Sequence, residues 1–481
     1  MTIDALPHRT RHRIAVIGGG ASGVLTAVNL LARSDDPGLE VVIHEASGVV
    51  GRGVAYGTND QRHLLNVRAR HMSAFPDSPG DLLDWALRTG RSDDPQGFLP
   101  RADFAIYLQD RLTDVADDRL RIRAGRVTDI VRTDPGSDSD PAGGFEIVTE
   151  RSRSRADAVV LCLGNQRPAP LRDASGEPLA EAPWHLANPW DLGRLRTLPA
   201  DARVLVIGTG LTAIDTAITL LEDGPRRRVS LVSRSGILPK PHVEQQHTAW
   251  VTKVPAGPLT ADLLAAAVRA ECEAARHLGV NWRNVVDGLR PHTQDIWRRL
   301  PLPERRRFLS VYDREWEVRR HRMAPEVALR LARYRFEGRL TVASGALHTT
   351  TDLGARCAVS TAPGGPASEV DAVVNCTGPL SDLGRATDPL LVALRDSGLI
   401  APDPLALGLD TTLDGRVVGI DGGVVGGLFT VGPARKGTLW ESTAIPEIRA
   451  QAAGVAAILS DQLDGSGTST FEQSTLGLTP K

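Results

Sequence analysis

One pattern occurs twice in this chain and constrains its fold more than any other feature. It consists of a short apolar strand, a glycine-rich turn and a largely apolar helix. The first copy spans 13–33, and the second begins with a strand at 203–207, about 190 residues further along (208 − 18). Strand–turn–helix units of this kind build parallel sheets that are covered by helices. The repeat therefore predicts an α/β fold with two Rossmann-like domains.

The first glycine turn has the spacing of a dinucleotide-binding motif. Its glycines allow a tight turn and a close approach of the backbone to a pyrophosphate, and the helix that follows directs free N–H groups at the phosphates. Glu45 ends the next strand, 22 residues after Gly23 (45 − 23), where an acid hydrogen-bonds the ribose hydroxyls. An acid there suits an adenosine ribose without a 2′-phosphate, as in FAD or NAD. The predicted contact residues are Gly18, Gly20, Ala21, Ser22, Gly23 and Glu45.

The second glycine turn has alanine in its third position, which is an accepted variant. Its following strand ends in Ser233 and Arg234 instead of an acid, 21 residues after Ala213 (234 − 213). A guanidinium pairs with a 2′-phosphate, whereas a carboxylate would repel it. This favours NADPH over NADH, and the alternative is a solvated arginine at a strand end. The predicted contact residues are Gly208, Gly210, Ala213, Ser233 and Arg234.

Two dinucleotide units in one chain indicate an electron path from a nicotinamide to a flavin, so we assign FAD to the first unit and NADPH to the second. The FAD-binding domain is expected in two parts, 1–195 and 370–463, because a late apolar strand at 428–431, followed by Gly432, can return to the first sheet. The nicotinamide domain is expected at 196–369, with an arginine-rich helical insertion at about 258–340. The Gly/Ser/Thr-rich segment 464–481 is expected to be a flexible tail.

Smaller features complete the predicted organisation. Residues 119–150 alternate between apolar and polar positions and suggest a meander hairpin, and the Pro- and Trp-rich stretch 167–199 suggests a linker. An apolar strand at 158–163 ends at Gly164, which we place in the flavin site. Cys162 and Cys376 lie inside apolar strands and are predicted to be buried structural thiols.

Composition and charge exclude several classes of protein. The formal net charge is −2, so no global field draws the chain to nucleic acid or to an anionic membrane. The polar N-terminus and the glycines at 18–20 exclude a signal sequence and a membrane span there, which makes the cytoplasm the expected location. The four cysteines include no C-x-x-C pair and no metal-ligand spacing, which argues against a dithiol reductase and predicts no metal site.

Five longer segments carry a family resemblance that covers nearly the whole chain: G-R-G-V-A-Y-G-T at 51–58, H-L-L-N-V-R-A-R-H-M-S-A-F-P at 63–76, W-R-N-V-V-D-G-L-R-P-H-T at 282–293, H-R-M-A-P-E-V at 321–327 and G-T-L-W-E-S-T-A-I-P-E-I-R at 437–449. They resemble uncharacterised FAD/NAD(P)-binding proteins related to bacterial flavin-dependent urate hydroxylases. The resemblance implies that Arg70, His71, Met72 and Ser73 lie near the isoalloxazine ring, with Met72 packed on it. It also implies that Trp440, Glu441 and Thr443 close the flavin site.

A wider resemblance is to monooxygenases with two dinucleotide domains. His185 and Trp190 look like their linker signature, Asp215 matches an acidic position of their NADP helix, and Arg101-x-x-Phe104-x-x-Tyr107-Leu108 is similar to a segment of N-hydroxylating enzymes. The linker lacks the Phe-x-Gly start of the Baeyer–Villiger fingerprint, so ketone oxygenation is not expected.

These resemblances imply an NADPH-using flavoprotein monooxygenase. It would hydroxylate a small polar substrate, a urate-like heterocycle or an amine, with O2 through a flavin C4a-hydroperoxide. An NADPH-dependent flavin reductase or oxidase without oxygen insertion is the alternative, and a non-enzymatic flavin redox sensor is a third. His321 and its arginine neighbours form either an anion-binding patch or a solvated helix face. No catalytic residue and no oligomeric state is assigned.

Overall fold

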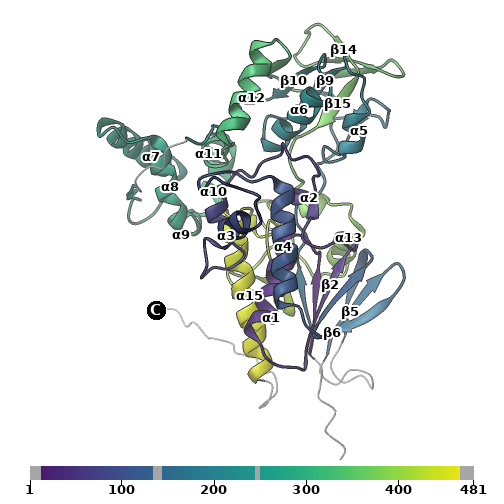
Figure 1. Cartoon of the computed structure of the whole chain (residues 1–481), viewed down its shortest axis with the longest axis vertical. Helices are drawn as coiled ribbons and strands as arrows, with labels where there is room; N and C mark the ends of the chain where they lie inside the picture. The colour runs from purple at the N-terminus through teal and green to yellow at the C-terminus, as the bar shows by residue number, and fades with distance from the viewer. Residues whose placement is uncertain (1–11, 134–142, 244–249, 466–481) are drawn as a thin grey trace, which may run out of the picture.

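The computed structural model describes residues 12–133, 143–243 and 250–465. Two α/β units lie at opposite ends of the long axis, and a group of helices projects to one side between them (Figure 1). This is the predicted architecture of two Rossmann-like units with a helix-rich insertion. Within these ranges, none of the helices has the length and apolar character needed to cross a lipid bilayer. The N-terminal segment before residue 12 and nearly all of the predicted tail lie outside the described residues.

The first unit is built on a six-stranded sheet in the order β16-β17-β7-β1-β2-β3. At its centre, β1 (His12–Ile17) runs parallel to β2 (Leu39–Glu45) and to β7 (Ala158–Leu161). These strands are apolar and buried along nearly their full length, as strands covered on both faces must be. The glycine turn therefore leaves the middle of the sheet, at the end of β1.

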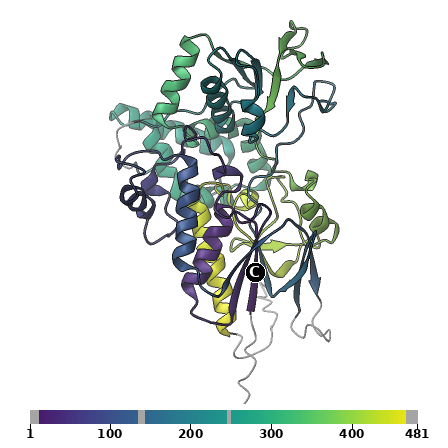
Figure 2. The ribbon, with the colours of Figure 1, turned by 45° about the vertical axis from the view of Figure 1, so that its right-hand side comes forward.

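Helices cover one face of this sheet and a second small sheet covers the other. α1 (Ala21–Arg33), α4 (Arg101–Val115) and α15 (Ile445–Gly465) run side by side and share one apolar core with the strands (Figures 1 and 2). On the opposite face lies a three-stranded antiparallel sheet, which packs there with α13. The elements on that face are β4 (Val127–Thr133), β5 (Gly144–Thr149), β6 (Arg153–Ala156) and α13 (Pro389–Asp396).

The late strand returns to the first sheet, as predicted. β17 (Val424–Thr430) runs parallel to β7, with Leu428 opposite Val159, and β16 (Arg416–Val418) adds an antiparallel edge. At the other edge, β3 (Leu120–Ala124) runs parallel to β2. The predicted meander was wrong for β3, because its alternating residues form an edge strand of the main sheet in which no residue is buried. The hairpin of β4 and β5 is present, and most of the turn predicted between them lies outside the described residues.

The second unit has a five-stranded parallel sheet in the order β11-β10-β9-β15-β8. Helices α6 (Leu211–Asp223) and α12 (Pro325–Phe336) pack on one face of it. Its strands are β8 (His185–Leu186), β9 (Arg203–Ile207), β10 (Arg228–Ser233), β11 (Leu340–Ser344) and β15 (Ala372–Asn375). A small antiparallel sheet of β12 (Thr349–Asp352), β13 (Cys357–Ser360) and β14 (Ser368–Val370) is attached to it.

Strand pairing moves two of the predicted domain boundaries. The strand at 372–375 was expected in the FAD-binding part, but Ala372 pairs with Val204 of β9, and β8 pairs with β15 on its outer side. A four-residue apolar strand satisfies either sheet equally well, so the sequence alone does not show which sheet it joins. The stretch 167–199 is likewise more than a linker, since it contains β8 and α5 (Leu192–Arg196).

The insertion consists of five helices, α7 to α11, among the residues that the structure describes. α7 begins after Thr260, whose hydroxyl accepts a hydrogen bond from the N–H of Leu263, and α8 begins after Asn281, which caps it in the same way. The predicted end of the insertion near 340 was too late, because α12 is part of the second unit's core. The helices are α7 (Ala261–His277), α8 (Trp282–Leu289), α9 (Thr293–Arg299), α10 (Leu302–Val311) and α11 (Asp313–Arg320). Short helices elsewhere are α2 (Gly53–Tyr56), α3 (Asp81–Arg88) and α14 (Lys436–Leu439).

Candidate dinucleotide sites and the region between them

The first glycine turn is closed tightly against its neighbours. Gly18 has φ +104, and a Cβ there would overlap the carbonyl oxygen of Cys162. A Cβ on Gly23 would overlap the carbonyl oxygen of Gly18, so α1 can begin this close to the turn only with glycine there. Gly20 is different, since the nearest atom to a Cβ would be Gly53 Cα at 3.4 Å. The space over Gly20 is thus left to an approaching group, as a pyrophosphate site requires.

Three other predicted FAD residues, Glu45, Gly164 and Gly432, lie at the carboxyl ends of β2, β7 and β17. Glu45 accepts a hydrogen bond from the Gly19 N–H at 2.8 Å, which holds its carboxylate beside the turn. Gly432 follows β17 with φ +105, and a Cβ there would lie 2.6 Å from Ser22 Oγ at the start of α1. Gly164 follows β7 with φ +59 and open space around it. Ligands of α/β proteins bind at this edge of the sheet.

The residues present fit a bound dinucleotide. α1 begins at Ala21 with no side chain capping its N-terminus, so its first N–H groups are available to phosphate oxygens. The Gln451 side chain accepts from the Gly432 N–H at 2.9 Å, while its own amide nitrogen is buried without a hydrogen-bond partner. An orphaned donor beside an open glycine turn is what a missing polar ligand would leave.

The second glycine turn repeats the first in detail. Gly208 has φ +129, and a Cβ there would overlap the carbonyl oxygen of Cys376, just as Gly18 lies against Cys162. A Cβ on Gly210 would meet nothing within 4 Å, and Ala213, in the first turn of α6, is fully buried. Like α1, α6 has no side-chain cap at its N-terminus.

The two cysteines under these turns are structural, as predicted. Cys162 and Cys376 are buried, and the hydroxyls of Thr26 and Thr216 contact their sulfur atoms at 3.8 and 3.5 Å. Burial raises the pKa of each thiol to about 12, so neither is a nucleophile at neutral pH. All four cysteines are free.

The strand end of the second unit leaves Arg234 exposed. Its carbonyl oxygen accepts a hydrogen bond from Ser344 Oγ at 2.7 Å, which fixes the backbone, while the guanidinium is not engaged by this bond. Ser233 is turned inward, and its hydroxyl lies 2.8 Å from Thr209 Oγ1 in the glycine turn. Both residues therefore lie at the strand end beside the glycine turn, where the spacing of the motif predicts the nucleotide ribose.

Part of the segment predicted near the flavin ring lies in the core of the first unit. Met72 is only 2% exposed and packs in the first unit's core, and Ser73 is fully buried, with its hydroxyl accepting from the Phe75 N–H at 3.0 Å. Arg70 donates to the His71 ring at 3.0 Å. Partial burial, together with nearby arginines, lowers the pKa of His71. The segment therefore combines buried residues, Met72 and Ser73, with an exposed His71.

The predicted closing segment connects the first unit to the insertion. Trp440 has φ +62, and its ring stacks on Trp297 of α9 with centroids 4.7 Å apart and meets Phe308 edge-on at 5.3 Å. Glu441 is 4% exposed and pairs with the buried Arg320 at 3.1 Å. Trp440 thus belongs to the apolar core of the insertion, a placement that the sequence reading did not favour.

Two of the predicted residues line a small cavity beside α14. Its volume is about 170 Å³, and its polar wall comes from amide, hydroxyl and ammonium groups. The residues that give it this character are Gly164, Asn165, Gln166, Ser381, Lys436 and Thr443. Gly164 and Thr443 were both placed in the flavin site from the sequence, so the cavity marks where strand β7 and the closing segment meet.

A cluster of ionisable side chains on α11 was not predicted. Glu317 lies 3.4 Å from Lys436 Nζ and 3.5 Å from His321 Nε2. Asp313 has one buried carboxylate oxygen without a partner, and burial, reinforced by Glu317, raises its pKa to about 6. Asp313 and Glu317 lie one turn apart on one face of α11, and His321 follows at the C-terminal end of the helix. This spacing is a signal that the sequence does contain.

The same helix contacts the second glycine turn. Arg314 donates to Thr209 Oγ1 at 2.9 Å and to Ser235 Oγ at 3.2 Å. α11 therefore lies between the predicted NADPH turn and α14. Of the arginines beside His321, Arg320 and Arg322 are buried and paired with carboxylates, so they are not a solvated helix face.

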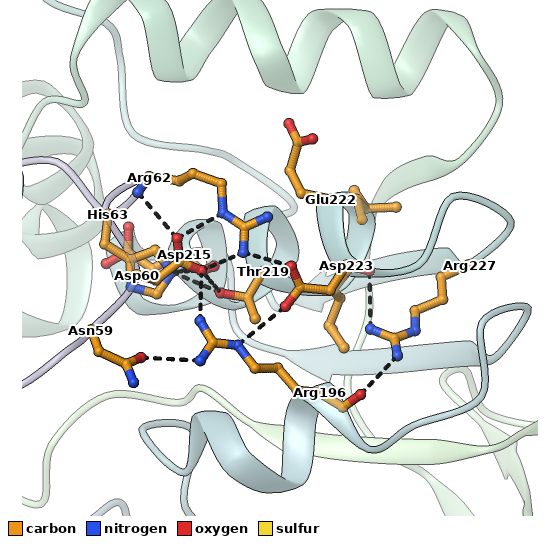
Figure 3. A network of polar contacts seen from close by, with 12 residues as sticks. Asn59, Asp60, Arg62, His63, Arg196, Asp215, Thr219, Glu222, Asp223 and Arg227 are labelled. Carbon is orange, nitrogen blue, oxygen red and sulfur yellow. Dashed lines mark hydrogen bonds and ion pairs between the residues drawn. The ribbon is translucent and has the colours of Figure 1, made fainter.

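A buried polar contact joins the two units directly (Figure 3). Asp60, 4% exposed, accepts two hydrogen bonds from the Arg62 side chain, one from the Arg62 backbone N–H, and one from Thr219 Oγ1 of α6 at 3.0 Å. His63 Nε2 lies 2.8 Å from the same hydroxyl, and Arg62 also pairs with Asp223 at 2.7 Å. Burial opposes ionisation of Asp60, but its bonds to Arg62 outweigh this and hold its pKa well below the ordinary range. Nearby, Arg101 pairs with Asp215, the acid of the predicted NADP helix, at 2.9 Å.

Sequence comparisons find similarity to known proteins, and the match to a family model lies in the first unit. Residues 15–166 match the model of a family described as FAD-NAD(P)-binding. A monooxygenase of Penicillium crustosum is 27% identical over 263 residues, 52% of this chain and 41% of the relative. A 3-dehydro-bile acid delta(4,6)-reductase of Clostridium scindens is 26% identical over 194 residues, 37% of this chain and 45% of the relative. The chain spans less than half the length of these curated relatives.

Solved structures resemble nearly the whole chain. The ornithine hydroxylase of Pseudomonas aeruginosa in its reduced form has a TM-score of 0.65 at 17% identity, covering 94% of this chain and 100% of that one. L-lysine 6-monooxygenase of Pseudomonas syringae has a TM-score of 0.61 at 18% identity, covering 93% and 99%. Residues 15–166 thus have the sequence character of the FAD-NAD(P)-binding family, within a fold that this chain shares with two amino-acid hydroxylases.

Proposed function

We propose that the chain is a monooxygenase that uses FAD and NADPH to hydroxylate a nitrogen or carbon of a small molecule with O2. The observation that carries this proposal is the pair of glycine turns, each at the carboxyl edge of its own parallel sheet and each left open at its middle glycine. A sensor has no need of a second nucleotide unit. When bound, FAD supplies hydride acceptance and activation of O2.

The residues divide between the two nucleotides. The first turn, Glu45 and Gly432 would hold FAD, and the second turn with Ser233 and Arg234 would hold NADPH, the guanidinium pairing with the 2′-phosphate. We also propose that the first unit is the FAD-binding domain and the second unit the nicotinamide-binding domain. Met72 and Thr443 would contact the flavin.

The region between the turns supplies groups that can hold and exchange protons. α11 brings Asp313 and Glu317 near Lys436, and His321 at the end of the helix pairs with Glu317. The pKa of about 6 puts Asp313 in the range where it exchanges a proton near neutral pH. The small polar cavity beside α14 suits a urate-like heterocycle or an amine, whose polar edge would meet the amides of Asn165 and Gln166. We also propose that the chain is related to flavin-dependent urate hydroxylases.

A reductase or oxidase that passes electrons without oxygen insertion is the second candidate. The similarity of part of the chain to a bile-acid reductase favours it. A dithiol route is not supported, because the buried cysteines lie under separate glycine turns.

Stopped-flow mixing separates the two candidates. The purified flavoprotein is reduced with NADPH under nitrogen and then mixed with O2, with and without urate and L-ornithine as trial substrates. A transient absorbance distinct from both reduced and oxidised flavin, and an oxygenated product, are expected of the monooxygenase. Direct return of the oxidised spectrum, with stoichiometric hydrogen peroxide under every condition, would assign the oxidase instead.

A further inference from the structure

The insertion encloses a large cavity of its own. It lies among α7, α8, α9, α10 and α11 and has a volume of about 930 Å³. Ligand pockets range from about 300 to 1,000 Å³, so this one is at the upper end. None of the residues assigned to either nucleotide lines it except Trp440, which forms part of its wall from the first unit. The cavity is therefore separate from the small polar cavity beside α14.

Its lining is mainly apolar and unusually aromatic. The sequence has 8 tryptophans, and four of them line this one space. Protein cores are close-packed, so a space of this size with so many apolar walls is not an ordinary packing defect. The tryptophans are Trp282, Trp297, Trp316 and Trp440, and the aliphatic walls come from Leu264, Val268, Val280, Val286, Leu289, Ile296 and Leu300.

Charge on the lining is one-sided. The cations Lys240, Arg269, Arg276, Arg283 and Arg319 line the cavity against the two carboxylates of Glu273 and Glu315. Both carboxylates are already engaged, Glu273 with Arg276 at 2.6 Å and Glu315 with Arg269 at 3.1 Å. The excess of positive charge would repel an amine and attract an acid.

Arg283 differs from the other arginines of the cavity. It donates to the Pro241 carbonyl oxygen at 2.7 and 2.9 Å and to Asn281 Oδ1 at 3.2 Å, all of them neutral acceptors. Among the ion pairs of the described part of the chain, none includes Arg283. Its guanidinium lies over the Trp282 ring at 4.5 Å. Trp316, also in the lining, has a buried indole N–H with no hydrogen-bond partner.

We propose that this cavity binds an apolar carboxylate: a ligand with a large aryl or alkyl body and one carboxylate group. The body packs on the tryptophans, and the carboxylate accepts hydrogen bonds from Arg283. A free amino acid the size of ornithine would leave most of the space empty and would bring an ammonium group toward the cations. The ligand's body also reaches Trp440, which ties the cavity to the segment beside α14. The inference concerns binding and does not rest on the flavin chemistry proposed above.

Two probes with the same body isolate the role of charge. 1-Pyrenebutyrate carries a carboxylate, and 1-pyrenebutanol replaces it with a hydroxyl. Binding is followed by quenching of tryptophan fluorescence in the FAD-loaded protein, where the four lining tryptophans give a direct signal. We expect saturable binding of pyrenebutyrate at one site per chain, about tenfold to a hundredfold tighter than pyrenebutanol, as for a charge-assisted hydrogen bond.

Three variants locate the site. Arg283→Met should remove the preference for pyrenebutyrate and leave the affinity for pyrenebutanol within about threefold, since one charge-assisted bond is lost. Arg276→Met is the matched control, because Arg276 lines the same cavity but is already paired with Glu273, and both affinities should stay within about threefold, as for an exposed pair. Ala265→Trp places an indole in the cavity and should abolish binding of both probes.

FAD content and the thermal midpoint of each variant show whether it is folded. The proposal is overturned if pyrenebutyrate shows no saturable binding, or if both probes bind equally well and Ala265→Trp leaves them unaffected. Equal losses in Arg283→Met and Arg276→Met would overturn the role given to Arg283. Because binding is read from tryptophan emission, failure of NADPH to reduce the flavin would leave these results unchanged.

Discussion

Substituting Gly210 separates the second nucleotide site from the stability of the protein. Its backbone has φ −83 and ψ −173, which alanine adopts without strain, and a Cβ would meet no protein atom within 4 Å. Gly210→Ala should therefore change the free energy of unfolding by no more than about 0.5 kcal/mol. The FAD content should be unaffected, because Gly210 lies in the second unit.

NADPH affinity should change, because the new methyl group occupies the space through which a pyrophosphate approaches the turn. Loss of one charge-assisted hydrogen bond costs about 1.5–3 kcal/mol, so the Kd for NADPH should rise about tenfold to a hundredfold. The Kd is read from the concentration dependence of flavin bleaching under nitrogen, and stability is read from urea unfolding.

Gly454→Ala is the matched control, since Gly454 is on α15 and a Cβ there also meets nothing within 4 Å. It should leave both the NADPH Kd and the FAD content unchanged. An unchanged NADPH Kd in Gly210→Ala would mean that no nucleotide approaches this turn, and the reasoning from its open geometry would be refuted.

Three further substitutions test the NADPH site, the polar contact between the units and the buried His44. Arg234→Ala should weaken NADPH binding about tenfold, with NADH nearly unaffected, because only NADPH carries the 2′-phosphate; equal Kd values for the two nucleotides in the wild type would reject this role. Asp60→Asn removes the carboxylate that pairs with Arg62 between the units and should lower the free energy of unfolding by about 1–2 kcal/mol in urea titrations. The loss is no larger because Arg62 keeps Asp223 as a partner. An unchanged unfolding midpoint would contradict this prediction. Burial lowers the pKa of His44 from 6.5 to about 4. The neutral form of His44 therefore stabilises the fold fully above pH 6.5, and up to about 3 kcal/mol of the free energy of unfolding should be lost as the pH falls to 4. In His44→Leu, the free energy of unfolding measured in urea should vary less with pH across this window, and a pH dependence equal to wild type would refute the assignment.

The glycine turns could be predicted from the sequence because their constraints are local. Gly18 and Gly208 need positive φ and close approach to a strand-end carbonyl, and these needs appear directly in the spacing of the motif. Glu45 could be placed for the same reason, since it ends the strand that follows. The return of β17 was also predictable, because an apolar strand followed by Gly432 needs a buried sheet position.

Strand pairing and packing between distant parts of the chain could not be predicted from the sequence. β15 is too short for its composition to select between two apolar sheets, and only the pairing of Ala372 with Val204 decides. Trp440 was expected at the flavin, yet it stacks on Trp297, which is about 140 residues away (440 − 297) in an insertion whose packing no local pattern describes. The face of α11 that carries Asp313 shows helical spacing, but its position beside Lys436 depends on how three parts of the chain pack together.

An anaerobic titration of the purified, FAD-containing protein with NADPH shows whether the two glycine turns hold the two nucleotides. If the first turn holds FAD and the second holds NADPH, the visible flavin absorbance should bleach with about one equivalent of NADPH, and NADH should require a higher concentration for the same rate. The Gly210→Ala variant should need more NADPH, with its FAD content intact. A protein that retains FAD but is not bleached by either nucleotide, alone or with urate or L-ornithine present, would contradict the two-site account.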